Sequence, residues 1–248
     1  MPEGDSLRRV ALRLEPLVGE RLQASAPDPR GVTVARATDG RVLESVEAVG
    51  KHLLLRFDGD VVVRSHLGMN GRWRVDRAGE PLRGRPWLVL RGGTLQATQW
   101  RGSTLTLDDG RARRLGPDLL AETTDPARVA ERVAAMDPTR LLGEALVDQR
   151  LVAGVGNMWL AELLWHARLS PWQAVGEIRP ADLEAALAWA QTEMRRAVHG
   201  ARAARAVYRR AGRGCPRCGT PIRSRGLGDA NRTAYWCSTC QSPGAAPG

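Results

Sequence analysis

The sequence predicts an α+β protein with three structured parts: an N-terminal β-sandwich, a helical domain and a small four-cysteine hairpin. Three observations predict it. Short apolar runs separated by turn residues fill the first half, apolar residues at helical spacing fill much of the second, and two cysteine pairs lie near the end. We place the parts at residues 1–116, 117–204 and 205–241, and expect 242–248 to be a disordered tail.

A helix is predicted first, with Asp5 or Ser6 as its N-cap. Its apolar positions share helical spacing: Leu7, Val10, Ala11, Leu14 and Leu17. Short strands are predicted over 42–49, 52–57, 61–65, 71–75, 87–91, 94–98 and 104–107. Their number and the turns between them indicate a β-sandwich. After Gly116-Pro117-Asp118, helices are predicted over 125–136, 139–148, 157–167 and 180–199.

The chain of 248 residues carries a formal net charge of +10, and Lys51 is the only lysine among its 37 basic residues. No acidic residue lies between Glu193 and Asp229. That interval holds Arg195, Arg196, Arg202, Arg205, Arg209, Arg210, Arg213, Arg217, Arg223 and Arg225. Such a block can be a solvated tail, but it leads into a cysteine motif, which favours a folded surface that binds a polyanion. The sequence has no signal-peptide pattern and no membrane-spanning apolar run, so we expect a cytoplasmic protein.

The cysteines form two pairs, Cys215-Pro-Arg-Cys218 and Cys237-Ser-Thr-Cys240, separated by 18 residues. In a reducing compartment this spacing is typical of a tetrahedral zinc site, with one pair on each knuckle of a hairpin. Few apolar residues surround the motif, so we expect one structural Zn²⁺ per chain to be needed for folding. Arg232 lies near the predicted hairpin tip, where a guanidinium can grip a phosphate.

The N-terminus combines Pro2 with Glu3. If Met1 is removed, Pro2 has a secondary amine, and an α-amino group with a pKa of about 7.7–8.0 is partly neutral near pH 7. A neutral amine can attack a sugar aldehyde to form a Schiff base, and Glu3 can exchange a proton beside it. The alternative is an ordinary acidic residue ahead of a helix.

A second motif surrounds Gly154 and Gly156. A helix is predicted to end near Gln149, the glycines shape a double turn, and Asn157 begins the next helix. The free backbone N–H groups at that helix start, together with the Asn157 side chain, suit a phosphate. No strand precedes these glycines, which argues against a dinucleotide fold.

Two single residues also stand out. Lys51 lies at a strand edge and could contact a phosphate or the reaction centre, or be an ordinary surface lysine. Met69 lies in a loop and could wedge into a base stack or fill core. The scattered histidines His52, His166 and His199 lack metal spacing and are taken as structural.

Together these motifs resemble the formamidopyrimidine-DNA glycosylase/endonuclease VIII family. The shared features are Pro2-Glu3-Gly4, Gly50-Lys51-His52, Asp148-Gln149 through Asn157, and the four-cysteine finger with Arg232. The opening Met-Pro-Glu-Gly-Asp is similar to the endonuclease VIII branch. The resemblance implies a helix–two-turn–helix domain between the sandwich and the zinc finger.

The resemblance also implies an activity, a bifunctional DNA glycosylase and abasic-site lyase of base excision repair. Pro2 would be the nucleophile, Glu3 the proton donor in base loss, and Lys51 an aid to elimination. Asn157 and Arg232 would clamp the DNA backbone, and Met69 would fill the hole left by the flipped base. For Arg232 we expect electrostatic stabilisation of the departing phosphate in δ-elimination, because a pKa above 12 makes a poor general acid.

The chain departs from the family pattern at two places. Position 6 is Ser6, where a second glutamate is common, and the segment Gly110–Leu115 is short. We expect a monomer that acts on damaged DNA at the nucleoid, with oxidised pyrimidines as substrates. The alternatives are an oxidised-purine glycosylase and a non-catalytic zinc-finger DNA-binding protein.

Overall fold

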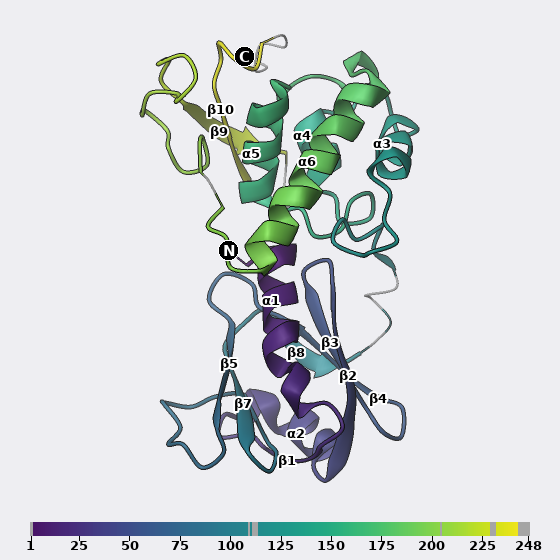
Figure 1. Ribbon diagram of the computed structural model, residues 1–248, viewed down its shortest axis with the longest axis vertical. Coiled ribbons are helices and arrows are strands. Elements are labelled where there is room, and N and C mark those ends of the chain that lie inside the picture. The colour runs from purple at the N-terminus through teal and green to yellow at the C-terminus, as the bar shows by residue number, and fades with distance from the viewer. Residues whose placement is uncertain (1, 109, 111–113, 204, 229–231, 243–248) are drawn as a thin grey trace. The chain divides into compact units, whose positions relative to one another are not determined.

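A computed structural model of the chain describes residues 2–108, 110, 114–203, 205–228 and 232–242. The chain forms two compact units, Met1–Arg114 and Leu115–Gly248, and each has its own hydrophobic core. The first unit contains an eight-stranded sheet, and the second contains helices and a two-stranded hairpin (Figure 1). The predicted α+β architecture is therefore confirmed.

The first helix, α1, spans Gly4–Leu14, so the predicted N-cap at Asp5 or Ser6 is wrong. Glu3 is the N-cap, with extended backbone angles, and its carbonyl oxygen accepts from the N–H groups of Ser6 and Leu7 at 2.9 and 3.1 Å. Asp5 instead lies in the first turn, where its carboxylate faces the positive end of the helix dipole and pairs with Arg9 at 3.1 Å. The helix thus begins directly after the Pro2-Glu3 pair.

The eight strands of the first unit are β1 Arg21–Ser25, β2 Arg41–Val49, β3 His52–Phe57, β4 Val61–His66, β5 Arg72–Arg77, β6 Leu88–Arg91, β7 Leu95–Trp100 and β8 Thr104–Leu107. The prediction omitted β1 and the short helix α2, Val32–Thr38. β1 does alternate polar and apolar residues, but it has only five residues and Leu22 is its only large apolar side chain, so its sequence pattern is weak. Short 3₁₀ turns cover Glu15–Leu17, Pro29–Gly31 and Val175–Glu177.

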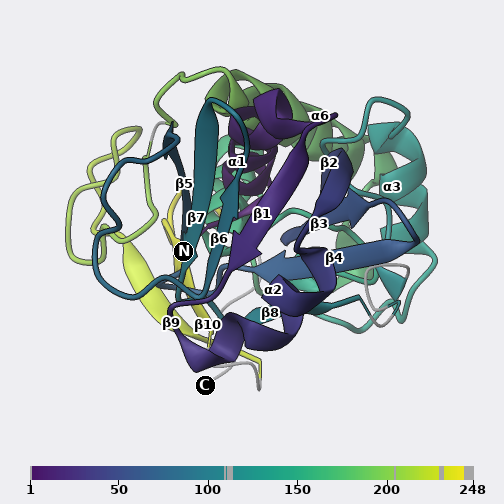
Figure 2. The same cartoon turned by 90° about the horizontal axis from the view of Figure 1, so that it is seen from below.

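Strand β1 joins the two halves of the sandwich. Its first residues pair with β2 and its later residues pair with β6, giving the order β5-β7-β6-β1-β2-β3-β4-β8 (Figure 2). Helix α1 packs against strands from both halves, β2, β3 and β5. Its buried Leu7 and Leu14 share one core with Leu53 of β3 and Leu90 of β6. The predicted β-sandwich is confirmed.

The helices of the second unit are α3 Pro126–Ala134, α4 Leu142–Val147, α5 Asn157–Ala167 and α6 Pro180–Val198. Helix α5 has the predicted bounds, whereas α4 begins three residues later than predicted. The Asp137 carboxylate accepts from both the backbone N–H and the hydroxyl of Thr139, at 2.9 and 2.7 Å. This local turn satisfies the backbone of the segment that was predicted to begin the helix.

The cysteine hairpin consists of β9 Arg223–Leu227 and β10 Arg232–Trp236, and it lies beside α5 (Figure 1). Its buried residues Leu227, Ala234 and Trp236 belong to the same hydrophobic cluster as Trp159 of α5 and Leu187 of α6. The hairpin therefore shares the core of the helices. Within the described residues, no helix combines the length and apolar character needed to cross a membrane.

Candidate functional site

Pro2 and Glu3 lie at the N-terminal end of α1. Pro2 is half-buried, and the Glu3 side chain is only 2% exposed. The backbone of Glu3 is fixed because its carbonyl caps the helix. A carboxyl group is thus held out of bulk water next to Pro2. This arrangement suits proton exchange with a group bound at Pro2.

Lys51 lies in the tight turn between β2 and β3, where Gly50 adopts a left-handed conformation with φ +57. The lysine is 8% exposed. That burial contradicts the alternative of an ordinary surface lysine. A buried ammonium is costly unless its surroundings compensate it, so its position calls for a specific role.

The structure adds His66, which the sequence reasoning did not select, to the surroundings of Lys51. Strands β3 and β4 are antiparallel, with Leu53 paired to Ser65, so His52 and His66 are neighbours, with ring centroids 4.9 Å apart. Burial, then the charges of Lys51 and Arg64, hold the pKa of His66 below its usual value. The Nδ1 atom of His66 hydrogen bonds with the Ser103 hydroxyl. Only the strand register could have revealed this group in the sequence.

Met69 lies in the loop that follows β4, and its side chain is 71% exposed. The loop closes through a hydrogen bond from the Gly71 N–H to the Leu67 carbonyl at 2.8 Å. A Cβ at Gly71 would lie 2.4 Å from that carbonyl oxygen, so the turn requires glycine there. The exposure contradicts the alternative that Met69 fills core.

Asn157 and Arg232 lie together in the second unit. Asn157 is the first residue of α5, and its Nδ2 donates to the Thr233 carbonyl at 2.7 Å. Arg232 begins β10, and its Nη1 donates to the Val147 carbonyl at the end of α4, at 2.9 Å. The helix–two-turn–helix segment and the finger hairpin therefore meet at these two residues.

A groove of about 430 Å³ opens beside them. It is lined by Arg140, Glu144, Val147, Asp148, Gln149, Arg150, Leu227, Gly228 and Arg232. Arg150 and Arg140 both bond the Asp148 carboxylate, and mainly the Arg150 hydrogen bonds hold the pKa of Asp148 well below its usual range. Asp148 thus fixes two guanidinium groups in a groove that the carboxylate of Glu144 and the guanidinium of Arg232 also line.

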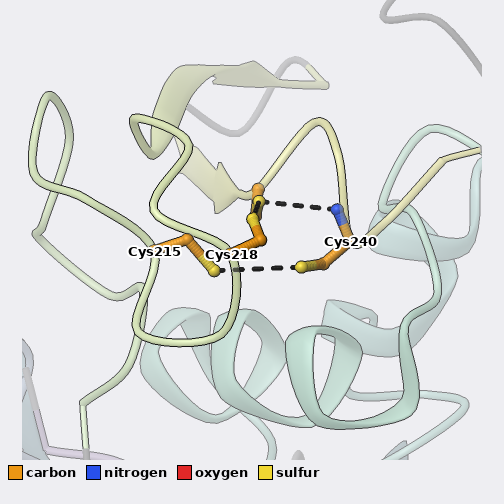
Figure 3. A group of neighbouring side chains, drawn as sticks. Cys215, Cys218 and Cys240 are labelled. Carbon is orange, nitrogen blue, oxygen red and sulfur yellow. Dashed lines mark hydrogen bonds between the residues drawn. The ribbon is translucent and has the colours of Figure 1, made fainter.

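The four cysteines, Cys215, Cys218, Cys237 and Cys240, bring their sulfur atoms within 4.8 Å of one another. The sulfur atoms of Cys215 and Cys240 are 3.9 Å apart (Figure 3). The sulfur atoms of Cys218 and Cys237 are 3.4 Å apart. Zn–S bonds of about 2.3 Å in a tetrahedron require sulfur separations of about 3.8 Å. The donor set and its geometry therefore fit a four-coordinate thiolate metal site.

The two units divide the candidate residues. Pro2, Glu3, Lys51 and Met69 belong to the first unit, and Asn157, Arg232 and the cysteines belong to the second. Ser6 accepts a hydrogen bond from Arg9 at 3.2 Å, and Arg9 also pairs with Asp5, so the Ser6 hydroxyl helps hold this arginine beside Asp5. Residues 111–113 of the Gly110–Leu115 segment, Asn231 and residues 243–248 of the expected tail lie outside the described residues.

Two family models match the chain. The formamidopyrimidine-DNA glycosylase N-terminal domain matches residues 1–116, and the formamidopyrimidine-DNA glycosylase H2TH domain matches residues 115–207. A sandwich that begins with a Pro-Glu helix start, followed by this helical motif and a four-cysteine hairpin, defines a DNA-repair enzyme. The chain belongs to the formamidopyrimidine-DNA glycosylase/endonuclease VIII family of DNA glycosylases and abasic-site lyases.

Similar proteins agree with this assignment. The chain is 38% identical to a probable endonuclease 8 2 of Streptomyces coelicolor, over 100% of this chain and 97% of the relative. It is 36% identical to the DNA-(apurinic or apyrimidinic site) lyase Nei2 of Mycolicibacterium smegmatis, over 98% of this chain and 99% of that protein. The crystal structure of Lactococcus lactis formamidopyrimidine-DNA glycosylase bound to DNA containing an AP site has the same fold. It matches with a TM-score of 0.82 at 22% identity, over 98% of this chain and 100% of that chain.

We predict that NMR will show His66 titrating below the ordinary histidine pKa of about 6.5. Lys51→Met should move the midpoint upward, because one of the positive charges that disfavour the imidazolium is removed. Native His66 binds fewer protons than the unfolded chain does. Its contribution to stability is therefore present above pH 6.5 and is lost as the pH falls from there through the lower pKa of the folded protein. A midpoint that Lys51→Met leaves unchanged would contradict this coupling; His199→Gln serves as the control, at an exposed position.

Proposed function

We propose that the protein excises oxidised bases from DNA, with oxidised pyrimidines as the preferred class, and then cleaves the strand by β,δ-elimination. The observation that carries this proposal is the buried Glu3 carboxyl placed directly after Pro2 at the start of α1. The endonuclease 8 names of relatives at 33–38% identity favour the pyrimidine branch over an oxidised-purine glycosylase.

The chemistry begins at the Pro2 nitrogen, exposed once Met1 is removed. Its lone pair bonds to the sugar C1′ as the bond from C1′ to the base breaks, and Glu3 supplies the proton that the departing base takes up. The nitrogen then releases its proton, the C1′–O4′ bond of the sugar ring breaks and O4′ takes up a proton, which leaves an iminium at C1′. This iminium acidifies the neighbouring sugar C–H groups. Loss of a C2′ proton then expels the 3′ phosphate, and loss of a C4′ proton expels the 5′ phosphate. Lys51 assists these eliminations and contacts a phosphate.

The second unit holds the DNA backbone in this proposal. The amide of Asn157 has two N–H donors, and one is used by Thr233, so the other is available to a phosphate. Arg232 has five donors, and its hydrogen bond to Val147 leaves the rest of the guanidinium for a departing or flanking phosphate. Exposed Met69 suits the hole left by a flipped base.

The four cysteines would hold one Zn²⁺, which supplies structural cross-linking of the two knuckles rather than catalysis. The donor set is all sulfur, which leaves a tetrahedral ion no open position for water or substrate. We propose a cytoplasmic monomer that acts alone on damaged DNA.

Metal analysis of the purified protein should find one zinc per chain. Cys237→Ser together with Cys240→Ser should abolish it, because two of the four thiolate ligands are lost. Chelation should also lower the melting temperature of the wild-type protein, since the knuckles contribute to the core of the helices. Zinc retained by the double variant, or absent from the wild type, would contradict the site.

Glu3→Gln should abolish base excision and leave cleavage at a preformed abasic site partly intact. Base departure requires a proton from Glu3, whereas the aldehyde of an abasic site is already open to the Pro2 amine. The measurement is a gel assay of nicking on oligonucleotides that carry thymine glycol or an abasic site. Equal loss of both activities would show that Glu3 acts by positioning Pro2.

Borohydride should trap a covalent adduct between an abasic oligonucleotide and the peptide that begins at Pro2. A neutral amine is required, and an ordinary lysine with a pKa of about 10.4 is almost entirely charged at pH 7. A short N-terminal extension should therefore abolish trapping. Lys51→Arg should keep DNA binding but slow strand cleavage, because a guanidinium cannot exchange a proton near neutral pH.

Two outcomes would overturn this assignment: an adduct mapped to Lys51, or full trapping by the extended protein. The absence of any adduct, with DNA binding intact, would favour the non-catalytic DNA-binding alternative. Trapping strongest on oxidised guanine would favour the oxidised-purine alternative.

A further inference from the structure

The Val147 carbonyl, at the C-terminal end of α4, accepts two side-chain hydrogen bonds. One comes from Arg232 Nη1 at 2.9 Å, and the other from Gln149 Nε2 at 3.1 Å. Carbonyl oxygens have two lone pairs, so both bonds can form together. The finger arginine and a glutamine of the two-turn segment therefore share one acceptor.

Gln149 also spans the two-turn segment. Its Nε2 donates to the Val155 carbonyl at 2.8 Å, and its Oε1 accepts from the Gly154 N–H at 3.1 Å. The side-chain amide thus uses both donor hydrogens and its acceptor on backbone groups. These bonds join the end of α4 to the residues that lead into α5, two positions before Asn157. The Gln149 side chain therefore cross-links the two ends of the loop between α4 and α5.

Arg232 is fixed from two directions as a result. Its guanidinium bonds the Val147 carbonyl, and the next residue, Thr233, accepts from Asn157 at the start of α5. Gln149 bonds the Val147 carbonyl directly. It also bonds Gly154 and Val155, which lie just before Asn157 in the chain. Without the Gln149 side chain, the Val147 carbonyl could reorient. The spacing between the end of α4 and the start of α5 would also be less restricted.

We propose that Gln149 is a positioning residue of the phosphate clamp: it fixes the Val147 carbonyl, which orients Arg232 relative to the N-terminus of α5. This inference rests on the proposed function, since it requires that Arg232 binds a DNA phosphate. Gln149 itself need not contact DNA. Its effect on DNA binding acts through Arg232.

The experiment is a double-mutant cycle between Gln149→Met and Arg232→Ala. Methionine keeps the length of the side chain and removes all three hydrogen bonds. Affinity for duplex DNA with a tetrahydrofuran abasic analogue is measured over a series of salt concentrations. The slope of log affinity against log salt reports the number of phosphate contacts.

Arg232→Ala should weaken binding roughly tenfold and reduce the salt slope by about 1. Gln149→Met should weaken binding severalfold and reduce the slope in the same direction. In the Arg232→Ala background, Gln149→Met should change the affinity less than about twofold, because the group it positions is gone.

Gln191→Met is the matched control. Gln191 Nε2 also bridges two backbone carbonyls, those of Leu119 and Thr124, at 2.9 and 3.0 Å in the same unit. This variant should lower the melting temperature and leave the salt slope unchanged. A Gln149→Met protein that behaves like the control would overturn the inference.

Additive effects of Gln149→Met and Arg232→Ala would also overturn it, since they would show that Gln149 acts independently of Arg232. If Gln149→Met does not fold, Gln149→Leu is measured in its place. Failure of both to fold while Gln191→Met folds would assign Gln149 a general structural role and overturn the proposal. A wild-type salt slope near zero, or an Arg232→Ala protein with unchanged binding, would instead refute the proposed clamp.

Discussion

The second unit depends on hydrogen bonds that tie α5 to the cysteine hairpin at both of its ends. At the first turn, Asn157 donates to the Thr233 carbonyl of β10. At the last turn, the indole N–H of Trp165 donates to the Cys215 sulfur at 3.3 Å, and Arg217 stacks on the same indole at 4.2 Å. Arg217 also donates to the Trp165 carbonyl at 3.0 Å, at the helix end where the Arg168 N–H bonds the same oxygen at 3.3 Å. The cysteine cluster and the candidate phosphate-binding residue Asn157 thus lie at opposite ends of one helix.

A buried carboxylate strengthens the middle of that helix. Glu162 of α5 accepts from the consecutive N–H groups of Ala206, Val207 and Tyr208, at 2.7 to 3.0 Å, in the chain that enters the hairpin. Burial raises the pKa of Glu162, and the three hydrogen bonds oppose that rise. The hydrogen bonds offset part of the cost of desolvating the carboxylate. They also hold Ala206, Val207 and Tyr208 of the arginine-rich stretch against α5.

The sequence predicted the features that depend on local patterns. The helix α5 and the strands β3 and β8 have the predicted bounds, because their apolar spacing or alternation is regular and their ends carry turn residues. The cysteine cluster was predictable because two Cys-x-x-Cys pairs are typical of a four-cysteine metal site. Strand β1 was missed because its register with β2 and β6 depends on tertiary pairing and not on its own composition.

The site shows the same division. Pro2, Glu3 and Lys51 could be proposed from the sequence because Pro2 and Glu3 are adjacent at the N-terminus and Lys51 is the only lysine. His66 was missed because its place beside Lys51 follows from strand register, and Gln149 because its role follows from three hydrogen bonds across a loop. The N-cap was misassigned to Asp5 or Ser6 because the propensity of Asp and Ser for caps ignores the extended backbone of Glu3.

Lys51 is the only lysine in a chain with 36 arginines, and its burial suggests why arginine does not replace it. A chain that uses arginine at its 36 other basic positions keeps lysine at 51, where the side chain is 8% exposed and lies near His66. Arginine is a planar, permanently charged fork, so it suits the exposed phosphate-binding surface. A compact ammonium can occupy a narrow buried site and can exchange its proton. Selection for elimination chemistry at the sugar would therefore retain lysine at this position even when the rest of the chain has drifted to arginine.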